Sequence, residues 1–453
     1  MKKSTVYHRL FPARRGKRVS IRRNVVNLSL PVLLSSLFQR LVSIVDIFLV
    51  GGLGATAIAA TGLGQLLIFV VMTLFWGLAT GTTVVIAHLS GAGRHDDARK
   101  AAFTALVACA LMAVGASIFG CVTGDVIAHF LGARDEVLAL SSGYIRLVFL
   151  YFAFTAGLNI LSAIMHGIGN TRTPMEGVIL VNLLHILVAY PLIYGKFGLP
   201  QLGVTGAAYA INASEFFGCL YLLGHALRRG YLRIGKPDVS LFRKIWRIGY
   251  PAALERVAQQ SGQLFYSKYI ISFGTAAYAA HQIGLSIESL SFMPGAGMGI
   301  AAATLMGQAL GARKVRQARM SHREALRLAI IVMASMALLF LFIPHVLIGL
   351  FTHDADVIAK GCIFLRLVAF AQVPLALSFV YAGSLRGTGD THYVFLVTLA
   401  AMWGIRVFLS YVAVVWLHLS LPVVWGIFLL DWFFRAAAFA WRYRQRDLHS
   451  VII

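Results

Sequence analysis

Carboxylates inside apolar stretches are the residues of this chain best suited to chemistry. Asp46 lies in the run VSIVDIFLVGG (42–52), and Glu215, Glu255 and Glu288 have similarly apolar surroundings. A charged side chain in hydrocarbon costs about 3 kcal/mol or more, so such residues usually face a protein interior or a watery cavity and serve a function. These four acids are therefore the first candidates for a functional site.

The elements that carry these acids are predicted to be membrane-spanning helices. Hydrophobic residues make up 59% of the chain, whereas soluble domains contain about 45–50% apolar residues. A helix needs about 20 apolar residues to cross a bilayer. We therefore predict an all-α integral membrane protein with twelve transmembrane helices, near residues 25–50, 60–89, 101–124, 141–165, 176–196, 204–227, 246–271, 277–309, 326–350, 358–384, 393–417 and 423–441.

The distribution of basic residues predicts the orientation. Most of the 40 Lys and Arg residues fall in the two tails and in every second loop, while the alternate loops hold only Arg134 and Lys196. Cytoplasmic segments carry such an excess, so we expect a multi-pass protein of the cell membrane with both termini in the cytoplasm. This topology and attraction to anionic membrane lipid account for the net charge of +23, and no nucleic-acid partner is expected.

An internal repeat divides the chain into two halves. LGATAIAATGLG (53–64) aligns with FGTAAYAAHQIG (273–284), and the same offset, without a gap, aligns HGIGNT (166–171) with RGTGDT (386–391). Six helices per half is an even number, so the repeats must be parallel. We predict a basic tail (1–21), an N-lobe (22–227), a linker (228–241), a C-lobe (242–441) and a second tail (442–453).

Several segments resemble the multidrug and toxic compound extrusion (MATE) family. They are LPVLLSSLFQRLVSIVDIFLVGGLGATAIAATGLGQ (30–65), GTTVVIAHLSGAGRHDDARKA (81–101), GKFGLPQLGVTGAAYA (195–210), PAALERVAQQSGQLFYSKYIISFGTAAYAAHQIG (251–284) and AATLMGQALGARKVRQAR (302–319). The resemblance implies two six-helix lobes around a V-shaped central cavity. It also implies a transporter, not an enzyme, that exports organic and often cationic small molecules by alternating access, against entry of protons or sodium ions.

The resemblance also suggests a coupling site. The first-helix Asp that Asp46 resembles binds the coupling ion in that family, with an Asn that Asn182 matches and polar partners expected where Asn159 and Thr205 fall. The segment NLLHILVAYPLIYG (182–195) lacks the family's second carboxylate. A Na⁺ site needs several oxygen ligands, whereas a proton needs one carboxylate, so we expect proton coupling, with Na⁺ as the alternative and no cofactor.

Other side chains are candidates for the substrate cavity. Aromatic and Met side chains suit flat organic cations, and Glu255 follows a Pro that weakens its helix. The full set is Gln39, Trp76, Phe154, Glu255, Gln259, Glu288, Phe292 and Met293.

Two other functions are weighed against export. A flippase for lipids or polyprenyl-linked sugars would need many cationic side chains in its cavity, and only Arg40, Arg256, Lys268, Arg366 and Arg406 are expected inside spans. A membrane enzyme would need a clustered catalytic set, but His166, His185 and His281 stand apart in the sequence. We expect a monomer that transports a small organic molecule.

Overall fold

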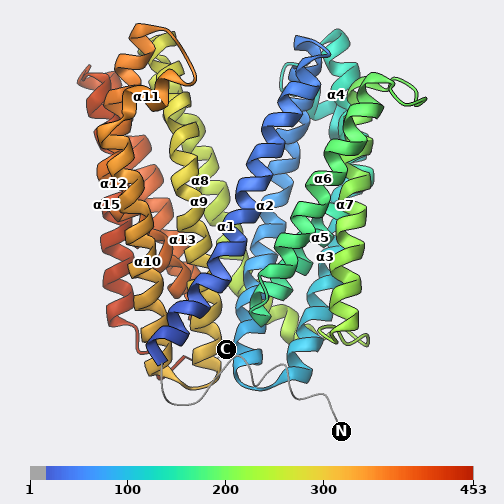
Figure 1. The fold of residues 1–453 in the computed structure, drawn as a ribbon, viewed down its shortest axis with the longest axis vertical. Helices are drawn as coiled ribbons and strands as arrows, with labels where there is room; N and C mark the ends of the chain where they lie inside the picture. The colour runs from blue at the N-terminus through green and yellow to red at the C-terminus, as the bar shows by residue number, and fades with distance from the viewer. Residues whose placement is uncertain (1–16, 452–453) are drawn as a thin grey trace.

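The computed structural model describes residues 17–451, which form two helical bundles side by side (Figure 1). Residues 1–16 of the predicted basic tail and residues 452–453 lie outside the described residues. The N bundle contains α1 (Lys17–Gly51), α2 (Ala55–Gly91), α3 (His95–Phe130), α4 (Asp135–Leu150), α5 (Phe152–Ile168), α6 (Arg172–Tyr194) and α7 (Gly203–Arg228). The C bundle contains α8 (Val239–Ile271), α9 (Thr275–Gly311), α10 (Val315–Phe342), α11 (Pro344–Gly349), α12 (Ala355–Gly387), α13 (Thr391–Leu399), η2 (Ala400–Val407), α14 (Phe408–Tyr411), η3 (Val412–Trp416) and α15 (Leu421–Gln445).

The helices confirm an all-helical, multi-pass membrane protein. Within residues 17–451, nine helices are long and apolar enough to cross a bilayer, and the pair α4 and α5, bent by 49°, meets the same criteria when the two are counted as one span. Helices α7 and α8 complete the twelve predicted spans and run alongside the others (Figure 1). The fourth span differs from the straight helix expected, because it breaks at Tyr151. The eleventh passes into the π-helical segments η2 and η3.

The repeat is visible in the backbone as well as in the sequence. Helices α2 and α9 begin at equivalent positions of the repeat, Ala55 and Thr275, and they also end at equivalent positions. Gly54 and Gly274 precede these two helices with φ of 104° and 99°, a conformation that residues with a Cβ rarely adopt. The two halves therefore turn in the same way at equivalent positions.

Helix α1 contacts both bundles. We call the end of the molecule where α1 begins the terminal end, and the end where α1 finishes the outer end. Near the terminal end α1 packs on α9 and α10, and toward the outer end it packs on α6, so it crosses between the bundles (Figure 1). Its outer half is poorly covered, with Leu41 59% and Phe48 76% exposed.

Glycines bring the two bundles into contact near the terminal end. A Cβ added at Gly91 of α2 would lie 2.0 Å from the Gln308 carbonyl oxygen of α9. A Cβ at Gly311, the repeat equivalent of Gly91, would lie 2.1 Å from the His88 carbonyl oxygen. Side chains at these positions would force the helices apart, so glycine is what permits the close approach.

Two equivalent hydrogen bonds join the bundles at the same level. His88 Nε2 of α2 donates to the Gly387 carbonyl oxygen at 2.7 Å, and Gln308 Nε2 of α9 donates to the Gly167 carbonyl oxygen at 3.0 Å. His88 and Gln308 occupy equivalent positions of the repeat, as do Gly167 and Gly387. We call this pair of bonds the interbundle latch. It closes the terminal end, while the bundles diverge toward the outer end (Figure 1).

The segment between the bundles is anchored at the start of α8. The Asp238 carboxylate accepts hydrogen bonds from the Ser240 hydroxyl at 2.6 Å and from the backbone N–H groups of Ser240 and Leu241. The Ser240 hydroxyl and these N–H groups hold the pKa of Asp238 below its usual range. The Asp238 backbone N–H in turn donates to Thr104 of α3, which ties the linker to the N bundle.

Replacing Gly91 with leucine should open the terminal end. The new side chain would overlap the α9 backbone, so the bundles must separate there. Double electron–electron resonance between spin labels at Lys100 and Arg316, which are exposed on α3 and α10, should show a longer distance distribution in a background without the native cysteines. Gly115→Leu is the control, because a Cβ at Gly115 meets nothing within 4 Å. Equal distributions for both variants would contradict the close approach.

Candidate functional site

Asp46 of α1 is hydrogen-bonded to His185 of α6. His185 Nε2 donates to Asp46 Oδ1 at 2.6 Å. The His185 side chain is 6% exposed and the Asp46 side chain 27% exposed. A short hydrogen bond to a carboxylate in a place with little water is of the strong, charge-assisted kind. The pair therefore fastens α1 to α6 inside the N bundle.

The surroundings of this pair form a small pocket toward the outer end. A cavity of about 20 Å³ is lined by Asp46 and His185 with Thr61, Gln65 and Tyr144 among its polar neighbours. That volume is close to the space for one water molecule. A proton or a single small ligand fits here, but an organic substrate does not.

The partners that the family resemblance suggested for Asp46 are placed differently. Asn182 lies one helical turn before His185 and is buried, and its Nδ2 has no hydrogen-bond partner. Asn159 lines the central cavity described below instead of the Asp46 pocket. Thr205 donates to the Leu202 carbonyl oxygen of its own first helical turn. Among the described residues, the hydrogen bond to the Asp46 carboxylate comes from His185, which was not one of the expected partners.

His185 is the residue that sequence reasoning missed. The sequence shows it apart from other catalytic residue types, so it was expected to stand alone; the contact with Asp46 shows that this was wrong. A signal was present, because Asn182 and His185 are three residues apart and so share a helix face. What the sequence could not supply is the register of α6 against α1.

A larger cavity lies between the two bundles. Its volume is about 390 Å³, within the range typical of sites for small organic molecules. The N-bundle wall comes from α2 and α5, and the C-bundle wall comes mainly from α8, α9, α12 and α15. On α2 and α9, the latch residues His88 and Gln308 lie between the cavity-lining residues and the terminal end.

The structure brings together half of the cavity candidates. Trp76, Glu255, Gln259 and Phe292 line the central cavity. The other four are not among its lining residues: Gln39 is exposed on α1, Phe154 packs between Tyr151 and Phe216, Glu288 is buried in the C bundle, and Met293 is half-buried on α9. Glu215, the remaining acid, accepts a hydrogen bond from Thr155 within the N bundle.

The cavity holds more cationic side chains than the sequence indicated. Arg386 and Arg435 are not among the five cations expected inside spans, but both line the cavity together with Arg256. Arg386 Nη2 lies 2.6 Å from Glu255 Oε1. The Arg256 guanidinium stands over the Trp76 ring of the opposite bundle, 5.5 Å from its centroid.

Comparison with known proteins identifies the family. The model of the MatE family matches residues 31–191 and 251–412, more than half of the chain. The chain belongs to the MatE family. It is therefore a transporter and not an enzyme, and the two matched segments lie in the two bundles.

Relatives of this MatE transporter cover nearly its whole length. It is 29% identical over 420 residues to a protein of Thermotoga maritima named "Probable multidrug resistance protein NorM", covering 92% of this chain and 90% of the relative. It is 28% identical over 393 residues to "Multidrug resistance protein NorM" of Burkholderia vietnamiensis, covering 84% and 85%.

Solved transporter structures share the fold. A multidrug resistance MATE family transporter in an outward-facing conformation matches with a TM-score of 0.86 at 23% identity, covering 96% of this chain and all of the other. A MOP superfamily transporter from Pyrococcus furiosus matches with a TM-score of 0.85 at 24% identity, covering 96% and 98%.

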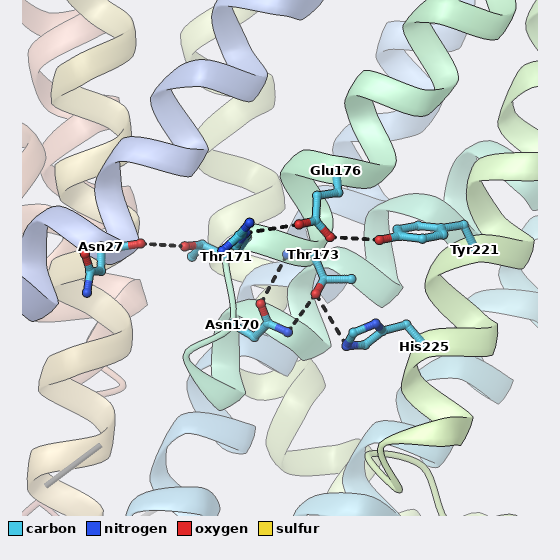
Figure 2. Close-up of polar contacts among 8 residues, drawn as sticks. Asn27, Asn170, Thr171, Thr173, Glu176, Tyr221 and His225 are labelled. Carbon is cyan, nitrogen blue, oxygen red and sulfur yellow. Dashed lines mark hydrogen bonds and ion pairs between the residues drawn. The ribbon is translucent and has the colours of Figure 1, made fainter. Parts of the chain in front are cut away.

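Polar side chains at the terminal end connect the first turn of α6 to its neighbours in this MatE transporter (Figure 2). Thr171 donates to the Asn27 carbonyl oxygen of α1 at 3.3 Å, and Tyr221 of α7 donates to Glu176 at 2.8 Å. Asn170 Oδ1 accepts the Thr173 backbone N–H at 3.2 Å. Helix α6 is therefore joined to α1 here as well as at the Asp46–His185 pair.

The C bundle contains a buried charged network behind the cavity wall. Asp431 of α15 is fully buried and contacts Arg406 of η2 at 2.5 Å and Arg435 at 2.6 Å. The Arg406 guanidinium also lies 4.2 Å from the Phe428 ring centroid. One carboxylate thus serves two buried guanidinium groups, and removing it leaves both without their anionic partner.

Asp431→Asn should destabilise the C bundle strongly. Breaking a buried ion pair by removing one partner costs about 3–5 kcal/mol, so the apparent melting temperature of the protein in detergent should fall markedly. Asp356→Asn is the control, because Asp356 pairs with Lys360 on the surface, where an i,i+4 pair contributes only about 0.3–0.5 kcal/mol. Equal melting temperatures for the two variants would contradict the structural role of the network.

Proposed function

We propose that this MatE transporter is a proton-coupled antiporter that exports small organic molecules by alternating access. The observation that carries the proposal is the Asp46–His185 pair, which is enclosed in the N bundle and separate from the central cavity. Two relatives covering most of the chain are named as multidrug resistance proteins, and the cavity has the volume of a drug-sized site.

The chemistry of the Asp46 pocket favours a proton over Na⁺. The group closest to the carboxylate is an imidazole nitrogen at 2.6 Å, whereas hard cations prefer several oxygen ligands. Both Asp46 and His185 accept and release protons, so the pair can hold a proton without further ligands. Na⁺ coupling is the alternative that the transport experiment below distinguishes.

Helix α1 is the element through which protonation of Asp46 changes the structure around the cavity. A neutral Asp46 carboxyl loses the charge that strengthens its bond to His185, which weakens the attachment of α1 to α6. Because α1 also packs on α9 and α10 and its outer half has few buried side chains, its displacement changes how the bundles meet. Weakly covered segments are the ones that move most readily.

The orientation follows from the basic residues. We assign the terminal end to the cytoplasm, because the positively charged loops lie there, and both termini with it. The closed latch then separates the cavity from the cytoplasm, which corresponds to an outward-facing state. The lobes that rock are residues 22–227 and 242–441, joined by the linker 228–241. Both the proton site and the cavity lie within one chain, so the monomer is the unit of transport.

Asp46→Asn should abolish transport driven by a pH gradient. A fluorescent zwitterionic fluoroquinolone is a suitable probe, because it bears both a carboxylate and an ammonium group and does not presuppose the charge of the natural substrate. In proteoliposomes the wild type should accumulate it under an imposed pH gradient, and Asp46→Asn should lower the rate at least about tenfold while the protein remains folded.

Asp125→Asn is the matched control, because Asp125 is a half-exposed acid of the N bundle that pairs with Arg146 away from the Asp46 pocket. It should transport as the wild type does. Gradient-driven transport by Asp46→Asn at the wild-type rate would contradict the assignment, and transport that follows a Na⁺ gradient instead of the pH gradient would establish the alternative ion.

A further inference from the structure

The charged side chains of the central cavity are predominantly cationic. Three guanidinium groups, those of Arg256, Arg386 and Arg435, line it, while Glu255 is the one carboxylate among the lining residues that the structure describes. All four come from the C bundle, and the N-bundle wall contributes only neutral polar, apolar and aromatic residues and His166. The field in the cavity therefore favours negative charge.

The acids near the cavity are already neutralised by arginines. Glu255 lies 2.6 Å from Arg386, with the Glu255 side chain 11% exposed. Asp431, behind the wall, is shared between Arg406 and Arg435. The family resemblance implies a cationic substrate. An organic cation in the cavity would have to displace Arg386 to pair with Glu255, the carboxylate among the described lining residues.

Arg256 is the cationic group available to a ligand. It is exposed to the cavity, and its contact is the Trp76 ring. A guanidinium held over an aromatic face still has N–H groups to donate, and these match a carboxylate in bidentate geometry. A bound carboxylate would therefore join α8, which carries Arg256, to the α2 wall through Trp76.

Aromatic side chains form the rest of the recognition surface. Phe292 and Phe379 contact each other edge to face with centroids 4.5 Å apart, and Trp432 lies beside them on the same wall. Such walls pack well against flat rings. We propose that the cavity selects amphipathic aromatic anions, with a carboxylate bound by Arg256 and a ring held between Trp76 and the Phe292–Phe379 pair. This inference rests on the proposed function only for the role of the cavity as the transport site.

A matched pair of ligands tests the charge preference directly. Isothermal titration calorimetry on the full chain in detergent would compare 2-naphthoate with 2-naphthylmethylammonium, which share a ring and differ in charge. The naphthoate should bind at least about tenfold more tightly. Arg256→Gln should lose about tenfold in naphthoate affinity, and Arg256→Lys should keep the preference for the anion with weaker binding. Arg247→Gln, an exposed arginine of α8 outside the cavity, should bind as the wild type does.

Tighter binding of the ammonium compound, no binding of naphthoate, or unchanged naphthoate affinity in Arg256→Gln would overturn the proposal. A second arm uses dioctanoyl phosphatidate, whose phosphate offers the same anionic chemistry on a lipid. If it binds and naphthoate does not, the cavity recognises a lipid headgroup and the aromatic class is wrong. These titrations need no ion gradient, so they can fail or succeed independently of proton coupling.

Discussion

One hydrogen bond between a carboxylate and an imidazole, Asp46 to His185, holds α1 in place, the least buried of the nine apolar spans among the described residues. Helix α1 is fastened to α6 at this pair and again where Thr171 reaches Asn27, and Tyr194 of α6 adds a bond to the Leu49 carbonyl oxygen. Of these three bonds, only the one at Asp46 can be altered by a proton. Helix α1 also packs on the C bundle. A change of protonation at this pair therefore affects a helix that contacts both bundles.

The contact between the two bundles is made by equivalent residues of the internal repeat. Gly91 and Gly311 allow the backbones of α2 and α9 to touch, and His88 and Gln308 reach equivalent carbonyl groups on the opposite bundle. Two bonds of about 1 kcal/mol each are weak enough to be broken by a modest change elsewhere. The internal repeat therefore provides a contact between the bundles that has a defined register and can still be broken. The charged side chains of the cavity, in contrast, lie in the C bundle alone and are not repeated in the N bundle.

Much of the fold could be predicted from the sequence because it depends on composition and repetition. The twelve spans and the two halves follow from apolar length and from the constant offset between the repeated segments. The bend at Tyr151 could not be predicted, since no proline or glycine marks it. For the site, Asp46, Trp76 and Glu255 stood out as polar or aromatic groups in spans, but the contact with His185 depends on helix register. Arg386 lies at the end of α12, where a sequence does not show which way a long side chain turns, and Arg435 lies inside α15, where a sequence does not show which face of the helix meets the cavity.

The most direct measurement of the link between Asp46 and α1 is a distance between two exposed positions as a function of pH. Spin labels at Phe48 on α1 and Phe130 at the outer end of α3, which are 76% and 85% exposed, report the position of α1 within the N bundle. Acidification should shift the distance distribution in the wild type, and Asp46→Asn should show the acidic distribution at every pH. A wild-type distance that ignores pH, or an Asp46→Asn distance that still follows it, would contradict the role of Asp46 as the proton-sensitive attachment of α1.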